Sequence, residues 1–323
     1  MRRRDLLRFG VGVFAAGSFT PAFDGQARSE SKTSPAHPGV PVVDTHTHFY
    51  DPTRPEGVPW PGKDDAVLYR PVLPPEFLKL TAPFGVVGTV VVEASPRFED
   101  NAWLLELAAK HRELFGIVGN LAPGEESFAA RVQGLAKNPR YRGFRVNHDR
   151  VRKGLDDAAF LKDMALVAEL GLVLDVNGGP DMPADVARLA EKLPKLKIAV
   201  NHLANLRHDG KTVPENWRKG MEACAARERV TVKVSAMVEA VVGQPKGTVP
   251  DSAEYYRPAL DTVWKLFGED RLVYGSNWPV SDRYAPFETV QKIATEYFTA
   301  RGRGAAEKFF SKNAERIYGY PAG

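Results

Sequence analysis

Two histidines separated by one residue, His46 and His48, are the clearest chemical feature of the 323-residue sequence. They follow the short β-branched run VVDT, so a strand would place both imidazoles on one face, about 6.6 Å apart along its length. At that spacing they can converge on a metal ion or on one substrate oxygen, and histidine is the most common metal ligand. The alternative is a pair of loop histidines whose hydrogen bonds are satisfied locally. Asp44, one step deeper on the same face, either supports His46 or stabilises a turn.

Polar side chains also stand at the ends of other β-branched runs along the chain. These residues are Glu93, Asn120, Arg145, Asn147, Asp175, Asn177, His202, Lys233, Ser235 and Asn277. An arginine at the end of a strand suits bidentate capture of a carboxylate, and a histidine can orient or deprotonate water near neutral pH. Two alternatives remain open: His202 caps the following helix, or Glu93 and Lys233 form a buried pair.

The runs that end in these residues are expected to be strands that alternate with helices. The expected strands are 42–47, 86–93, 116–121, 142–147, 171–176, 197–202, 230–235 and 271–276. The expected helices are 100–114, 126–137, 157–170, 181–193, 215–228, 252–268, 286–301 and 304–318. This alternation predicts an α/β fold of parallel βαβ units, and its length favours a single-domain (β/α)8 TIM barrel over a doubly wound sheet. The polar residues should then meet at the C-terminal mouth of the barrel, where such folds carry their chemistry.

The segment VVDTHTHFYDP at 42–52 resembles the opening motif of the amidohydrolase superfamily. The resemblance is to its amidohydrolase-related branch, which holds sugar lactonases, 2-pyrone-4,6-dicarboxylate lactonase and zinc-dependent decarboxylases. Further similar segments follow in the family's order, namely RGFR at 142–145, VNHLA at 200–204, YGSNWP at 274–279 and NAERIY at 313–318. The resemblance spans 42–319 and implies a lactonase-like hydrolase.

The resemblance also implies roles for individual residues when water opens the C–O ester of a carboxylated or sugar-derived lactone. His46 and His48 would polarise the carbonyl oxygen, directly or through a loosely held divalent ion such as zinc. His202 would handle protons. Arg145 would hold an anionic group, and Asn147 and Trp278 are expected to contact the substrate, although Trp278 could equally pack in the core.

Asn277 departs from the family pattern, which usually has an aspartate there that binds metal or activates water. An asparagine cannot accept a proton at accessible pH, and its neutral amide is a poor metal ligand. The family's fifth-strand histidine is also missing, with Asp175 nearest its place, so zinc is expected to be weakly held or absent. Three outcomes stay open: His202, Glu93 or Asp175 acts as base while Asn277 positions water; the reaction differs, for example metal-dependent decarboxylation; or the barrel only binds a small acid.

The N-terminus predicts export. Residues 1–27 begin with Arg2, Arg3 and Arg4, continue with an apolar stretch over 9–23 and resemble a twin-arginine signal. That stretch is shorter than the roughly 20 residues of a membrane span, so a periplasmic protein without stable membrane insertion is expected, with a membrane-tethered N-terminus as the alternative. Residues 28–41 are polar and rich in Pro and Gly, as in a flexible linker, which leaves 42–319 as the barrel domain.

The composition of the chain limits the classes of partner that it is expected to bind. A formal net charge of +4 over the whole chain is too small to indicate a nucleic-acid-binding protein, so a small-molecule substrate is the expected partner. The single cysteine, Cys224, excludes an internal disulfide and is expected to pack in a helix. The sequence leaves the oligomeric state open.

Overall fold

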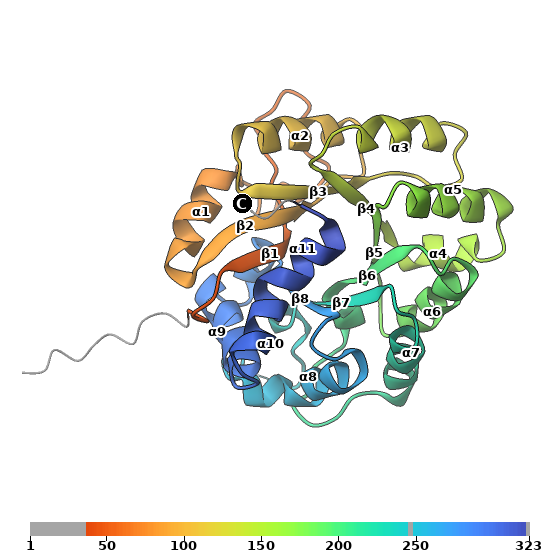
Figure 1. Cartoon of the computed structure of the whole chain (residues 1–323). Coiled ribbons are helices and arrows are strands. Elements are labelled where there is room, and N and C mark those ends of the chain that lie inside the picture. Colours follow the sequence, from red (N-terminus) through yellow and green to blue (C-terminus); the bar gives the residue numbers. More distant parts are fainter. Residues whose placement is uncertain (1–36, 245–247, 321–323) are drawn as a thin grey trace, which may run out of the picture. The chain divides into compact units, whose positions relative to one another are not determined.

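The computed structural model describes residues 37–244 and 248–320, and its centre is one sheet of eight parallel strands in sequence order. The strands are β1 (Val42–Thr47), β2 (Val86–Val92), β3 (Leu114–Asn120), β4 (Tyr141–Asn147), β5 (Val173–Asn177), β6 (Lys197–Val200), β7 (Val230–Val234) and β8 (Leu272–Tyr274). The chain just after β8 returns to β1: Thr47 forms a parallel bridge with Trp278, and the Asn277 amide donates to the His46 carbonyl at 2.9 Å. The sheet is therefore a nearly closed barrel, as the alternating pattern predicts (Figure 1).

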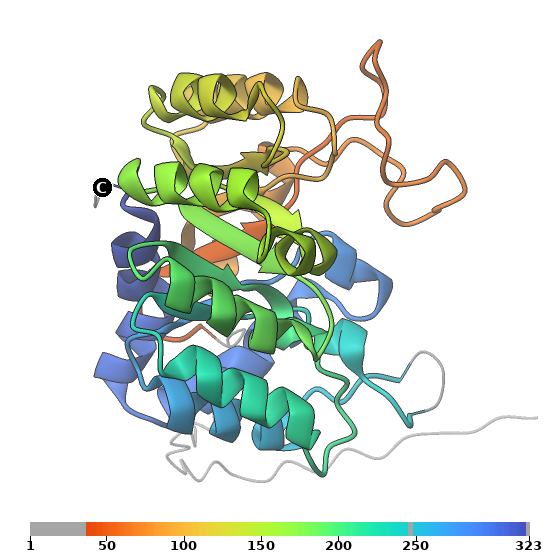
Figure 2. The same cartoon turned by 90° about the vertical axis from the view of Figure 1, so that its right-hand side faces the viewer.

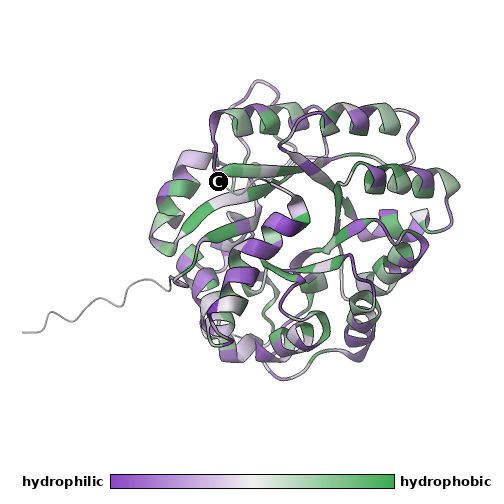
Figure 3. Ribbon diagram, viewed as in Figure 1, coloured by the Kyte–Doolittle hydropathy of each residue, from purple (hydrophilic) through white to green (hydrophobic). Residues whose placement is uncertain are grey.

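With the exception of the last one, the helices form a ring outside the strands (Figure 1). They are α1 (Pro74–Thr81), α2 (Asp100–Lys110), α3 (Phe128–Ala136), α4 (His148–Gly154), α5 (Ala158–Glu169), α6 (Met182–Lys192), α7 (Glu215–Ala225), α8 (Ala253–Phe267), α9 (Phe287–Thr299), α10 (Arg303–Glu307) and α11 (Asn313–Tyr318). Apolar residues recur along the strands and on the helix faces toward them, while polar residues dominate the outer faces (Figure 3). Among the residues described, no helix combines the length and apolarity that a bilayer span requires.

The two ends of the barrel are built differently. At one end, α11 lies across the strands, and its Ala314, Ile317 and Tyr318 pack with strand residues such as Val43 and Val173 that fill the barrel interior. At the opposite end, the long connection between β1 and α1 projects from the molecule (Figure 2). Because the strands are parallel, all their C-terminal ends open toward that second end.

Most expected elements are found within a few residues of their predicted bounds, and the exceptions have local causes. The sixth strand, expected to end at 202, ends at Val200, because residues 201–205 form a tight turn with left-handed backbone. The last helix is interrupted by a π-helical turn at Lys308–Lys312. Helix α1 was not predicted.

Helix α4 was not predicted either. Asn147 ends β4 and caps α4 by accepting a hydrogen bond from the Arg150 amide at 2.9 Å. The predicted export signal and most of the predicted linker lie outside the described residues.

Candidate active site

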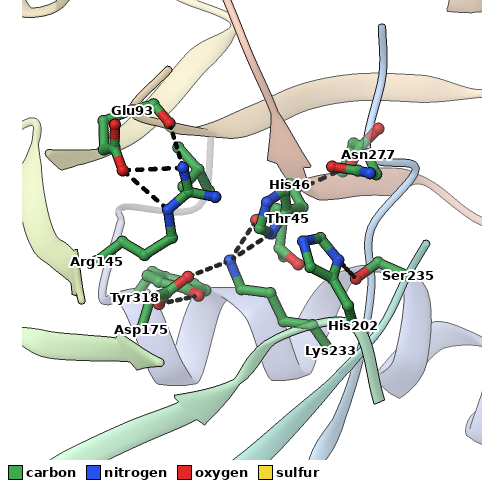
Figure 4. A network of polar contacts seen from close by, with 12 residues as sticks. Thr45, His46, Glu93, Arg145, Asp175, His202, Lys233, Ser235, Asn277 and Tyr318 are labelled. Atoms are coloured by element: carbon green, nitrogen blue, oxygen red, sulfur yellow. Dashed lines mark hydrogen bonds and ion pairs between the residues drawn. The ribbon is translucent and has the colours of Figure 1, made fainter. Parts of the chain in front are cut away.

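Three imidazoles form one cluster at the C-terminal end of the barrel. His46 and His48 come from the end of β1, and His202 comes from the turn after β6. The ring of His46 lies 4.2 Å from that of His202 and 5.1 Å from that of His48, centroid to centroid (Figure 4 labels His46 and His202). The structure thus brings together residues that are about 150 positions apart in the sequence.

The backbone around this cluster adopts conformations that are uncommon for residues with a Cβ. His202, Leu203, Ala204 and Asn205 follow one another with φ between 46° and 57°, and Asn277 after β8 has a φ of 62°. Such left-handed residues each cost of order 1 kcal/mol and tend to gather at functional sites. Here they turn the His202 and Asn277 side chains toward the barrel axis instead of letting the chain continue as strand.

Close packing of the eighth strand against the first also requires a specific residue. A Cβ on Gly275 would lie 2.8 Å from the Cβ of His46, which is too close for any other amino acid. Glycine therefore lets the end of β8 approach His46 and fixes the position of the neighbouring Asn277.

His48 is oriented by its two ring nitrogens. Nδ1 lies 2.9 Å from the Val92 carbonyl oxygen, and Nε2 lies 3.3 Å from Oδ1 of Asn277. A neutral imidazole has one N–H, and the shorter contact assigns that hydrogen to Nδ1, where it donates to the carbonyl. Nε2 of His48 is then left with a lone pair, and its contact with the Asn277 oxygen at 3.3 Å is one between two acceptors and not a hydrogen bond.

His46 is oriented by a lysine beneath it. The fully buried Lys233 ammonium donates to the Thr45 carbonyl at 2.7 Å and lies 3.5 Å from Nδ1 of His46. An ammonium group can only donate, so Nδ1 must accept and the ring hydrogen sits on Nε2. This Nε2 is buried and has no hydrogen-bond partner among the described residues.

Lys233 also pairs with Asp175 at 2.6 Å, and neither side chain is exposed. The hydroxyl of Tyr318 from α11 donates to Asp175 at 3.0 Å (Figure 4). The alternative of a Glu93–Lys233 pair is therefore wrong. Asp175, predicted as a candidate base, lies in this ion pair below the histidines.

Burial disfavours the charged form of all three imidazoles. Burial lowers the pKa of His46 and His202 well below the ordinary value and lowers the pKa of His48 to about 3. The cations Arg145 and Lys233 lower these values further, because a second positive charge nearby disfavours the imidazolium form. The cluster can therefore donate and accept hydrogen bonds, but it does not hold protons as a charged group.

Arg145 is held by the end of β2. Its Nε donates to Oε1 of Glu93 at 2.9 Å, and its Nη2 donates to the Glu93 carbonyl at 2.9 Å (Figure 4). The two side chains are only 18 % and 14 % exposed, so the arginine charge is largely matched by its partner. Glu93 is thus an anchor for Arg145, and its carboxylate is already engaged.

A cavity of about 360 Å³ opens above these residues. It is lined by His48, Trp60, Ala94, Arg145, Asn177, His202, Asn205, Ala236, Glu239, Asn277, Val280 and Tyr284. Glu239 was missed by the sequence analysis, because it lies in a short 3-10 turn after β7, where no spacing or motif marks it. Its Oε1 accepts a hydrogen bond from Nδ2 of Asn277 at 2.8 Å.

Two predicted substrate contacts lie elsewhere. Trp278 is fully buried and packs against Phe49 and Phe77, so it belongs to the core instead of the cavity wall. Trp60, from the β1–α1 connection, is the tryptophan that reaches the cavity. Asn147 caps α4 and borders a neighbouring groove that shares Arg145 with the cavity.

The side chains at the mouth do not fit a tightly held zinc ion. Within residues 37–244 and 248–320, no group of three or more His, Cys, Asp or Glu side chains is placed to hold a metal. Nε2 of His46 carries hydrogen, so it offers no lone pair, and the amide of Asn277 is a weak ligand. The nearby carboxylates Glu93 and Asp175 are already paired with Arg145 and Lys233, so they are not free to serve as ligands.

Comparisons with known proteins agree with the fold and place the chain in a family. The amidohydrolase family model matches residues 43–320. The chain is 30% identical over 248 residues to an L-fucono-1,5-lactonase from Burkholderia ambifaria, covering 74% of this chain and 80% of the relative. It is 27% identical over 293 residues to an L-fucono-1,5-lactonase from Burkholderia multivorans, covering 88% and 97%.

Among solved structures, an amidohydrolase from Burkholderia multivorans superposes with a TM-score of 0.77 at 24% identity, over 87% of this chain and 100% of the other. That protein has been crystallised with bound HEPES and with bound zinc. At this identity the superposition shows the fold alone, while the family match extends over nearly the whole barrel. The chain belongs to the amidohydrolase family and is a hydrolase.

Proposed function

We propose that this protein opens a sugar-derived lactone with water at the mouth of the barrel. The observation that carries the proposal is the combination of neutral imidazoles with a cavity rich in amides, since Asn177, Asn205 and Asn277 all line it. Amide groups both donate and accept hydrogen bonds and so suit sugar hydroxyls. The two curated relatives at 30% and 27% identity, both L-fucono-1,5-lactonases, support the same substrate class.

The charge balance favours a neutral sugar lactone over a dicarboxylated one. Arg145 is the cation that borders the cavity, and Glu93 already pairs with it. A substrate carboxylate would have to compete with that pair. A sugar hydroxyl or carbonyl oxygen can share the guanidinium without breaking it.

The neutral imidazoles suggest roles that differ from those expected from the sequence. Nδ1 of His202 and the Ser235 hydroxyl lie 2.9 Å apart, and either can donate. In the proposed reaction the hydroxyl donates, so that Nε2 of His202 carries hydrogen and donates to the lactone carbonyl oxygen. Nε2 of His48 has a lone pair and can accept a hydrogen bond from the attacking water. His46 lies one layer deeper and is fully buried, so it supports its neighbours instead of touching the substrate.

The proposed reaction needs no step through a metal ion, because the donor set does not fit one. Metal-dependent decarboxylation is disfavoured for the same reason. Dialysis of the purified chain against EDTA should leave lactone hydrolysis within about twofold of the untreated activity, with zinc far below one equivalent by elemental analysis. Stoichiometric zinc whose removal abolishes turnover would contradict this part of the proposal.

The direct test measures acid release from a panel of lactones. The expected result is turnover of 1,5-aldonolactones such as L-fucono-1,5-lactone, with weaker turnover of 2-pyrone-4,6-dicarboxylate. Stoichiometric binding of sugar acids without turnover of any lactone would instead identify a binding protein. Faster hydrolysis of the dicarboxylate would overturn the substrate class.

The place of action is part of the same proposal. The twin-arginine-like N-terminus and the linker-like 28–41 support export to the periplasm, where the barrel would meet sugar lactones from outside the cell. Fractionation of cells that express the full chain tests this, and replacement of Arg3 and Arg4 by lysine should retain the protein in the cytoplasm.

A further inference from the structure

Glu239 is a carboxylate at the cavity wall that the roles described so far do not use. It lies in the 3-10 turn Val238–Ala240, which follows β7 after a left-handed Ala236 with φ of 52°. That turn brings the side chain beside Asn277, whose Nδ2 donates to Oε1 at 2.8 Å. Oε2 is buried and has no hydrogen-bond partner among the described residues.

The other carboxylates near the histidines are already engaged. Asp44 lies below the cavity, and its Oδ1 accepts from the backbone amides of His46 and Ser276. Asp175 is paired with Lys233, and Glu93 is paired with Arg145. Among the described residues that line the cavity, Glu239 is the carboxylate, and its polar contact is a neutral amide, which leaves it able to accept a proton.

We propose that Glu239 is the general base that removes a proton from the attacking water, with Asn277 holding its carboxylate in place. This inference rests on the proposed lactonase function. As the water oxygen forms a bond to the lactone carbonyl carbon, one water hydrogen passes to Glu239. The ring C–O bond then breaks, and the proton moves from Glu239 to the departing ring oxygen, which becomes a hydroxyl group. The product is a hydroxy acid, and its ionisation releases one proton to solvent.

The electrostatic surroundings of Glu239 suit a base that works near neutral pH. Burial raises the pKa of Glu239 to about 7, and the Asn277 amide opposes this rise by favouring the charged form. Asp282, on the turn Val280–Arg283, raises the value further, and Tyr256 of α8 also interacts with this carboxylate. A base with a pKa close to the working pH combines adequate ionisation with adequate proton affinity.

The decisive variant is Glu239→Gln, which keeps the shape and can still contact Asn277 but cannot accept a proton. We expect kcat on a turned-over aldonolactone to fall about 10²- to 10⁴-fold, with KM changed less than about threefold. Wild-type kcat/KM should fall as pH decreases through about 7, because the base becomes protonated, and the variant should lose this limb. Circular dichroism confirms that the variant is folded.

Two further variants separate catalysis from charge and packing. Asp282→Asn neutralises the neighbouring carboxylate, which does not line the cavity, and should leave kcat within about threefold. Adding Asn277→Asp to Glu239→Gln returns one carboxylate to the same hydrogen-bonded pair and should recover at least about tenfold of the lost kcat.

The outcomes distinguish this inference from the proposed function. If wild type hydrolyses a lactone and Glu239→Gln keeps that rate, or if Asp282→Asn loses as much, Glu239 is not the base although the lactonase assignment stands. If wild type hydrolyses no lactone at all, the proposed function and this role for Glu239 fail together.

Discussion

The barrel interior contains two polar layers that handle charge in opposite ways. In the lower layer, next to α11, the Lys233 ammonium and the Asp175 carboxylate form an ion pair at 2.6 Å with no exposed surface. In the upper layer, at the mouth, neutral imidazoles face a cavity, and the Glu239 carboxylate is held by a neutral amide. The lower layer satisfies its charges and so holds the site in position. The upper layer leaves hydrogen-bonding capacity unused, which is what a substrate requires.

Breaking the lower layer should have the largest effect. Lys233→Met leaves Asp175 charged and buried without its partner, which should lower the free energy of unfolding by about 3–5 kcal/mol in urea denaturation. Lys233→Met combined with Asp175→Asn removes both charges and keeps an acceptor for Tyr318, so it should recover most of that loss. The exposed pair Lys292–Asp251, at 2.9 Å, offers a matched control, and Lys292→Met should change stability little. Equal losses at the two sites would show that burial is not what makes the inner pair important.

Removing one hydrogen bond from the lower layer should have a smaller effect. Tyr318→Phe deletes the donor to Asp175 and should cost about 1.5–3 kcal/mol of stability, as expected for a hydrogen bond to a charged group. Activity should decline modestly, because Asp175 positions Lys233 and Lys233 fixes the tautomer of His46. A variant with unchanged stability would mean that water replaces the hydroxyl at no cost.

The smallest effect is expected for the upper layer, as a change in how the melting temperature depends on pH. The pKa of Glu239 is about 7 in the folded protein, above its ordinary value of 4.5, so folding favours the protonated form. The stability that protonated Glu239 contributes to the wild-type protein is therefore lost as the pH rises from about 4.5 through 7. Glu239→Gln lacks this loss, and its melting temperature should exceed that of wild type by a few degrees at pH 8 but not at pH 4.5. Asp44, whose pKa is also raised, is present in both proteins, and its contribution cancels in the difference. A constant difference across pH would contradict the assignment.

The sequence predicts the part of this site that depends on strand periodicity. His46, His48, Arg145 and His202 stand at or just after strand ends, and parallel strands carry those ends to one mouth whatever the details of register. Most strand bounds can also be predicted, because short continuous runs of β-branched residues reflect burial on both faces of the barrel wall.

The remaining features depend on contacts that no local pattern encodes. The Lys233–Asp175 pair requires β5 and β7 to present their side chains at the same depth, which is a matter of barrel geometry. Glu239 reaches Asn277 through a turn whose shape rests on one left-handed residue, Ala236. Trp278 adjoins the polar mouth in sequence, yet the return of the chain to β1 points its ring into the core.

Helix α11 packs beneath the active site, on the side away from the cavity. Tyr318 contacts Asp175, and Asp175 pairs with Lys233. Lys233 in turn sets the hydrogen position on His46, which lies more than 250 residues before Tyr318 in the sequence. The arrangement of the histidines therefore depends on a helix that does not itself reach the cavity. Undocking α11 from the strands would therefore leave every mouth residue in the chain and still remove the contact that, through Asp175 and Lys233, fixes the hydrogen position on His46.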